Sequence, residues 1–127
     1  MTRRKTRFKM RPEMQDEPSS YRLFFAEPAE AESEAIYVGK MQNGLASADQ
    51  WYRGLARALD RVMLFPCGFP LASENEELGD GLRQMLYGRG ASTYRVLYYV
   101  FPPEDTEAGI IRVMHIYPAQ QGSLSQE

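Results

Sequence analysis

The sequence is poor in the side chains that build disulfides and metal centres. Its 127 residues include one cysteine, Cys67, and one histidine, His115. A single cysteine excludes a disulfide framework within the chain and is typical of a reducing compartment. One thiolate and one imidazole are also too few for a zinc site of the usual kind. We therefore expect no metal site and no cofactor.

Long hydrophobic runs are missing as well. No apolar segment approaches the roughly 18 residues of a membrane-spanning helix, and the charged start lacks the apolar segment of a secretory signal. With 43% hydrophobic and 25% charged residues, the composition is that of one globular domain. We expect a cytoplasmic protein, bacterial in style, with no membrane partner.

The net charge of −2 conceals an uneven distribution along the chain. Six basic residues precede the first acidic residue: Arg3, Arg4, Lys5, Arg7, Lys9 and Arg11. From residue 13 onward, nine basic residues stand against 17 acidic ones, a net charge of −8. We expect a flexible basic leader over 1–20, because this segment shows no helical or strand period. A single domain over 21–120 and a polar tail over 121–127 complete the expected organisation.

Apolar spacing predicts two helices after a first strand. The strand is expected over 21–25, which is rich in aromatic residues, and a helix from Pro28 to about Val38. Ser47-Ala48-Asp49-Gln50 has the form of a capping box and predicts the start of the second helix, which Pro66 ends. The second helix carries an apolar stripe at steps of three and four residues: Trp51, Leu55, Ala58, Leu59, Val62 and Phe65.

Three further strands are expected in the second half of the chain, over 82–87, 94–101 and 110–117. The connections at 88–93 and 102–109 are typical of antiparallel hairpins. The order strand, helix, helix, strand, strand, strand predicts an α+β fold, in which two N-terminal helices pack on one face of an antiparallel sheet.

An interval without acids carries the candidate anion-binding residues. No Asp or Glu lies between Asp80 and Glu104, whereas several arginines do. Guanidinium groups bind phosphate or carboxylate through forked hydrogen bonds. The candidate anion-binding set is Arg83, Arg89, Arg95 and Arg112. Tyrosines that could stack on bases alternate with these arginines: Tyr87, Tyr94, Tyr98 and Tyr99. An ordinary half-exposed sheet produces the same alternation, so the pattern leaves both interpretations open.

His115 also has two interpretations. It is a candidate general acid or base, since imidazole titrates near neutral pH. The alternative is a strand histidine that only contacts a neighbour, which the absence of a matched partner favours. A nucleophilic pair of Cys67 with His115 is disfavoured, because Cys67 lies in a proline-rich turn.

Several ordered motifs together resemble the RelE/ParE superfamily of type II toxin-antitoxin toxins, over about residues 21–120. They are Leu64-Phe65-Pro66, Pro70-Leu71-Ala72, Leu82 to Gly88, and above all Tyr94-Arg95-Val96-Leu97-Tyr98. The resemblance implies a small, plasmid-stabilisation-like toxin that inhibits growth through a macromolecular target. It also implies a cognate antitoxin as partner; the oligomeric state stays open.

Within this superfamily, RelE-like members cleave mRNA on the ribosome, whereas ParE-like members poison DNA gyrase. Arg83 and Arg95 match basic positions of the RelE-like pattern, and His115 or Tyr117 would serve in proton transfer. These four residues are the candidate catalytic set. Met85 stands where a further basic residue is expected.

The chain also ends differently from many RelE-like relatives. It has Tyr117-Pro118-Ala119-Gln120-Gln121 where they have an Arg-His pair and a later arginine. The departures favour the ParE-like activity and leave open whether the protein is an enzyme. The alternatives are a ribosome-dependent mRNA endonuclease and a degenerate toxin that only binds its antitoxin.

Overall fold

The computed structural model describes residues 20–78 and 81–119, so the expected leader and polar tail lie essentially outside the described residues. The strands are β1 (Tyr21–Phe25), β2 (Arg83–Tyr87), β3 (Tyr94–Phe101) and β4 (Gly109–Pro118). The helices are α1 (Glu27–Lys40), α2 (Leu45–Leu64) and the single turn α3 (Asn75–Leu78). Short 3₁₀ turns follow α1, α2 and β2 at Met41–Asn43, Pro66–Gly68 and Gly90–Ser92. No helix in the described part of the chain is long and apolar enough to cross a membrane.

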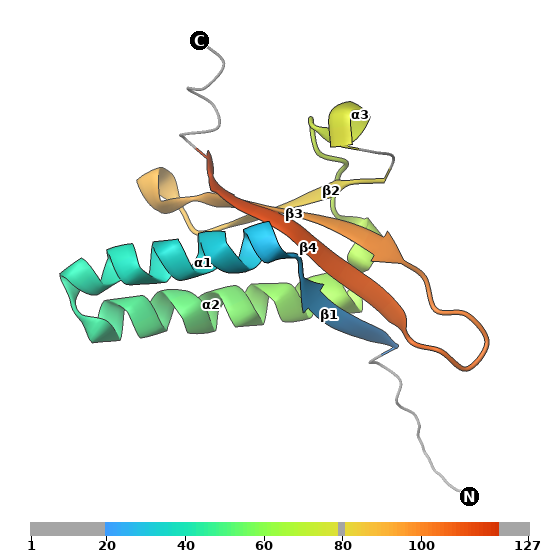
Figure 1. Ribbon diagram of the computed structural model, residues 1–127, viewed down its shortest axis with the longest axis horizontal. Coiled ribbons are helices and arrows are strands. Elements are labelled where there is room, and N and C mark those ends of the chain that lie inside the picture. Colours follow the sequence, from blue (N-terminus) through green and yellow to red (C-terminus); the bar gives the residue numbers. More distant parts are fainter. Residues whose placement is uncertain (1–19, 79–80, 120–127) are drawn as a thin grey trace, which may run out of the picture.

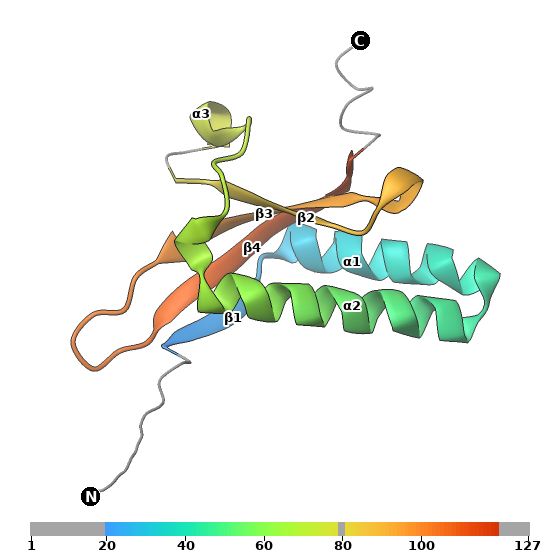
Figure 2. The ribbon, with the colours of Figure 1, turned by 180° about the vertical axis from the view of Figure 1, so that it is seen from behind.

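The four strands form one sheet in the order β1-β4-β3-β2. Helices α1 and α2 lie side by side on one face, while α3 lies on the other side of the sheet (Figures 1 and 2). Pairs β2–β3 and β3–β4 are antiparallel, as their hairpin connections predict. Strand β1 instead pairs with β4 in parallel, so the sheet is mixed and the expectation of a fully antiparallel sheet is corrected. A parallel pair needs a long crossover, which the helical pair supplies.

The main core lies between α2 and the sheet. The predicted stripe of α2 is buried from Trp51 to Val62 and packs against side chains of β3 and β4. Phe65 is the exception: the helix ends at Leu64, and Phe65, at φ −137° and ψ 67°, leaves the helical path. Its side chain is 68% exposed, which corrects its assignment to the stripe.

The start of α2 also differs from the prediction. The helix begins at Leu45 after Gly44, whose φ of 103° suits glycine, and no side chain in the described part of the chain caps it. Ser47 lies inside the first turn, so the predicted capping box is wrong. The connection between the two helices is shorter than expected, because α1 continues to Lys40, two residues past the predicted end, and α2 begins earlier.

A smaller core on the opposite face positions α3. Ala72, Leu82 and Leu97 are buried there. The backbone before α3 runs along the edge of β2, where Ala72 N donates to Leu82 O at 2.9 Å. The side chain of Asn75 accepts hydrogen bonds from Gly81 N and Leu82 N at 2.7 and 2.9 Å. These contacts hold α3 over the sheet face that the long helices leave open.

Candidate functional site

Three of the four candidate catalytic residues share the open face of the sheet, away from α1 and α2. Arg95 on β3 pairs across the sheet with Tyr117 on β4, and Leu97 pairs with His115. The rings of His115 and Tyr117 are stacked, with centroids 4.8 Å apart and planes 17° apart. Burial, together with nearby carboxylates of Glu32 and Glu74, raises the pKa of Tyr117.

Arg95 is engaged by partners from two elements. Its Nη1 and Nη2 donate to the two carboxylate oxygens of Glu74 at 2.7 and 2.5 Å, and its Nε donates to Gln84 Oε1 at 2.9 Å. The hydrogen bonds from Arg95 outweigh the effect of burial and lower the pKa of Glu74. The interval without acids in the sequence therefore has an acid beside it in space, and Arg95 is paired.

In the variant Glu74→Gln, the free energy of unfolding is expected to change less as the pH falls from 7 to 3 than it does in the wild type. Because the pKa of Glu74 is lowered in the folded state, its stabilising contribution is present above pH 4.5 and disappears as pH falls through the lowered value. At neutral pH the variant should lose about 1–2 kcal/mol of unfolding free energy, since Arg95 loses a charged partner. Urea unfolding between pH 7 and pH 3 measures both effects.

Glu76→Gln is the matched control, because Glu76 is an exposed carboxylate on α3, two residues after Glu74. We expect it to change stability by less than about 0.5 kcal/mol. An equal acid dependence in wild type and Glu74→Gln would contradict the role assigned to the pair.

His115 has a carboxylate partner that the sequence did not indicate. Glu32 on α1 accepts a hydrogen bond from Ile116 N at 2.8 Å through Oε1, and its Oε2 lies 3.1 Å from His115 Nδ1. Strand β1 pairs with β4 only as far as Val113, so Glu32 covers the edge of β4 beyond that point. The sequence signal was the acidic first half of α1, which has one carboxylate facing the sheet.

The four candidate anion-binding arginines do not form one group. Arg83 lies in register with Tyr98 on the face toward the helices, and its Nη1 donates to Phe69 O at 2.6 Å. Arg112 shares the open face with Arg95 but pairs with Tyr99, four residues and about 13 Å further along the sheet. Arg89 lies in the connection after β2. The structure thus separates residues that are close in sequence.

The same register decides between the two interpretations of the tyrosines. Tyr87, Tyr94 and Tyr98 pack into the core under the helices. Tyr98 is fully buried, and burial raises its pKa to about 12. Of the four tyrosines, Tyr99 alone packs on the open face, where its ring lies 6.4 Å from that of Phe101.

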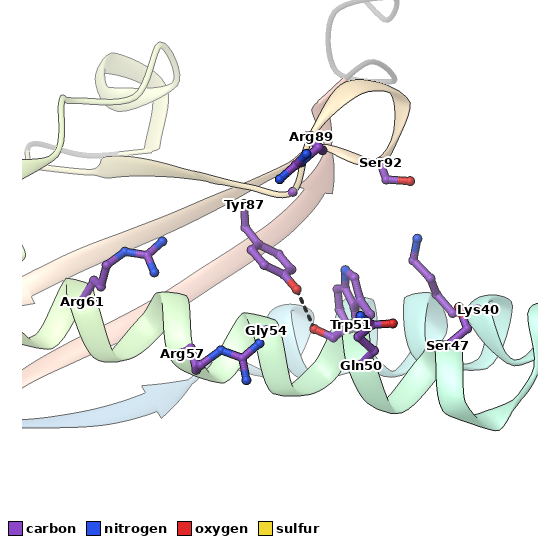
Figure 3. Close-up of a pocket in the computed structure, with 11 residues that line it drawn as sticks. Lys40, Ser47, Gln50, Trp51, Gly54, Arg57, Arg61, Tyr87, Arg89 and Ser92 are labelled. Atoms are coloured by element: carbon purple, nitrogen blue, oxygen red, sulfur yellow. Dashed lines mark hydrogen bonds between the residues drawn. The ribbon is translucent and has the colours of Figure 1, made fainter.

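A basic pocket between α2 and the β2–β3 connection was missed at the level of sequence. It has a volume of about 650 Å³, and its cationic lining residues are Lys40, Arg57, Arg61 and Arg89 (Figure 3). Arg57 and Arg61 lie four residues apart on α2, which puts them on one side of the helix. That spacing was visible, but it could equally mark a solvated face, and only the fold brings Lys40 and Arg89 to the same place.

Comparison with known proteins gives a match in structure only. No family model matches the chain, and no curated protein matches it in sequence. A chain from a solved structure described as a chromosomal ParDE toxin-antitoxin system from P. aeruginosa matches with a TM-score of 0.59 at 17% identity. The match covers 79% of this chain and 97% of the other. The protein therefore has the α+β fold found in a ParDE toxin-antitoxin system, as the resemblance to the RelE/ParE superfamily implies.

Proposed function

We propose that the protein is the toxin of a type II toxin-antitoxin pair. The observation that carries the proposal is the shared fold, which extends over 97% of a chain from a ParDE system. The motifs around Arg83 and Arg95, which resemble those of RelE/ParE toxins, support it independently of the fold. The proposed partner is the cognate antitoxin protein.

Uncovered apolar side chains support a protein partner. Near the turn that joins α1 to α2, several large side chains are about half exposed: Val38, Met41, Leu45 and Tyr52. On the open face of the sheet, Phe24, Phe101 and Ile110 are exposed as well. Gathered apolar surface of this kind commonly marks a binding site for another protein.

The first test is induced expression in bacteria, with and without the small gene adjacent to this one. We expect growth arrest when the protein is produced alone and recovery when the neighbour is produced with it, because the antitoxin covers the toxin surface. Colony counts after induction measure the effect. Unimpaired growth in every host tested would overturn the proposal, and complex formation without any arrest would identify a degenerate toxin that only binds its partner.

We favour gyrase poisoning, the ParE-like activity, because the candidate arginines already have partners. An RNA-cleaving site needs free cations for the developing negative charge on phosphorus. Arg95 is bound by Glu74, and Arg83 faces the helices, where it bonds to Phe69 O. Neither guanidinium is poised for a phosphate on the open face.

The second candidate is the ribosome-dependent mRNA endonuclease. It is favoured by one observation, that Arg95, Tyr117 and His115 occupy the same face of the sheet. Under this hypothesis Arg95 would leave Glu74 to hold the scissile phosphate, while His115 or Tyr117 would transfer the proton.

A further inference from the structure

We propose that the pocket between α2 and the β2–β3 connection binds the phosphate groups of a nucleotide-sized ligand. The pocket is separate from the open face described above, because it lies on the side of the sheet that carries the long helices (Figure 3). Its role does not depend on the toxin proposal.

Four cations surround the pocket from three parts of the fold. Lys40 comes from the end of α1, Arg57 and Arg61 from α2, and Arg89 from the connection after β2. Among the described residues, no Asp or Glu lines it. The lining itself is therefore positively charged, although the body of the protein is acidic and Asp49 lines the adjoining pocket that shares Arg57.

The pocket also contains a buried hydrogen-bond donor without a partner. Trp51 is only 7% exposed, and its Nε1 has no hydrogen-bond acceptor among the described residues. In Figure 3 the indole nitrogen lies on the side of the ring toward the β2–β3 connection. Buried donors are nearly always paired in proteins. The nitrogen is shielded from solvent, so an anionic oxygen in the pocket would accept this hydrogen bond after a small shift of the side chains that cover it.

A hydrogen bond holds the two sides of the pocket, β2 and α2, together. Tyr87 Oη donates to the backbone oxygen of Trp51 at 2.9 Å, which ties β2 to α2 (Figure 3). This approach needs a glycine at position 54, since a Cβ there would lie 2.1 Å from Tyr87 Oη. The framework of the pocket is therefore held in place, whereas the side chains of Arg57, Arg61 and Arg89 are exposed and become ordered on binding.

The arrangement suits phosphate better than carboxylate. A phosphate presents three or four oxygens in different directions, and a ligand with several phosphates can reach cations that are spread along α2. A carboxylate offers two oxygens in one plane. The volume of about 650 Å³ also falls in the range of pockets for small ligands and exceeds what a single phosphate fills.

Tryptophan fluorescence provides a direct test, because Trp51 is the one tryptophan of the sequence. The purified full chain is titrated with tripolyphosphate at constant ionic strength, with citrate as the carboxylate of similar charge. We expect a saturable change in emission with tripolyphosphate and none with citrate. Equal responses to the two anions, or no saturable response, would overturn the proposal.

Charge-neutral variants then locate the site. Arg57→Gln and Arg61→Gln should each weaken tripolyphosphate binding about tenfold, the effect of one lost charge-assisted hydrogen bond. Arg53→Gln removes the same charge from the exposed side of α2 outside this pocket and should bind as wild type does. Equal losses in all three variants would overturn the site, because they would show a nonspecific effect of net charge.

Two more titrations identify the source of the phosphate. ATP represents free nucleotides, and a short single-stranded RNA represents a nucleic-acid backbone. The source is the one that binds more tightly and whose binding is weakened by Arg57→Gln and Arg61→Gln. Polyglutamate is the protein-like competitor. Tighter binding of polyglutamate than of every phosphate compound would overturn the proposal in favour of an acidic peptide.

Discussion

Replacing Tyr98 by alanine is expected to lower the free energy of unfolding by about 3–5 kcal/mol, the usual cost of truncating a buried aromatic side chain. Tyr98 is fully buried in the centre of β3. Its hydroxyl donates to Pro66 O at 2.8 Å, so the ring also ties β3 to the end of α2. Domains of this size are stable by only about 5–15 kcal/mol, so this one change removes a large share. Urea unfolding followed by circular dichroism measures it.

The conservative variant Tyr98→Phe separates packing from the hydrogen bond. It keeps the ring and leaves Pro66 O without its donor, which should cost about 1–2 kcal/mol. Burial raises the pKa of Tyr98 from 10.0 to about 12, so the stability that this group contributes is present below pH 10 and is lost as pH rises toward 12. The wild type should therefore lose stability in this range more steeply than Tyr98→Phe. Tyr52→Phe, at a half-exposed position on α2, is the control and should have little effect.

The double variant Glu74→Gln with Arg95→Gln is expected to arrest growth as strongly as the wild type when it is produced without antitoxin. Both charges of the ion pair are removed together, so no unpaired charge is left beside the sheet. If the protein were an mRNA endonuclease that holds the scissile phosphate through Arg95, the double variant would lose most of its RNA-cleaving activity and of its toxicity. One charged hydrogen bond of about 1.5–3 kcal/mol corresponds to a decrease of about ten- to hundredfold in cleavage rate.

Mapping of transcript ends and of DNA damage during induction distinguishes the two outcomes. Intact transcripts with damaged DNA, in wild type and double variant alike, agree with gyrase poisoning. The endonuclease hypothesis would replace gyrase poisoning if the wild type cut transcripts within translated codons and the double variant did not. Cells that carry the Glu76→Gln variant serve as the control for handling and expression.

Local patterns in the sequence predicted most elements of the fold. The alternation of β3 and the spacing of the stripe from Trp51 to Val62 come from neighbouring residues, and both were predicted correctly. Errors arose where the outcome depends on contacts between distant parts of the chain. The parallel pairing of β1 is decided by where the helical pair returns the chain, and the exposure of Phe65 by where α2 ends.

The candidate site was less predictable than the fold. Arg95, His115 and Tyr117 could be selected by residue type, but their partners Glu74 and Glu32 are 21 and 83 residues away in the sequence. Neither distance leaves a local signal. The side of the sheet on which each arginine lies is likewise set by strand register, because a shift of one residue exchanges the two faces.

The sequence by itself determined the long helices and the strands, their order and the excess of negative charge after the basic start, since these follow from residue type and short-range spacing. Only the tertiary structure decided which charges meet. It paired Arg95 with Glu74 and turned Arg83 toward the helices. It also brought Lys40, Arg57, Arg61 and Arg89 to the lining of one pocket, which Trp51 shares. The physical reason is that electrostatic and hydrogen-bond energies depend on distance in space, which the fold sets and the order of residues does not.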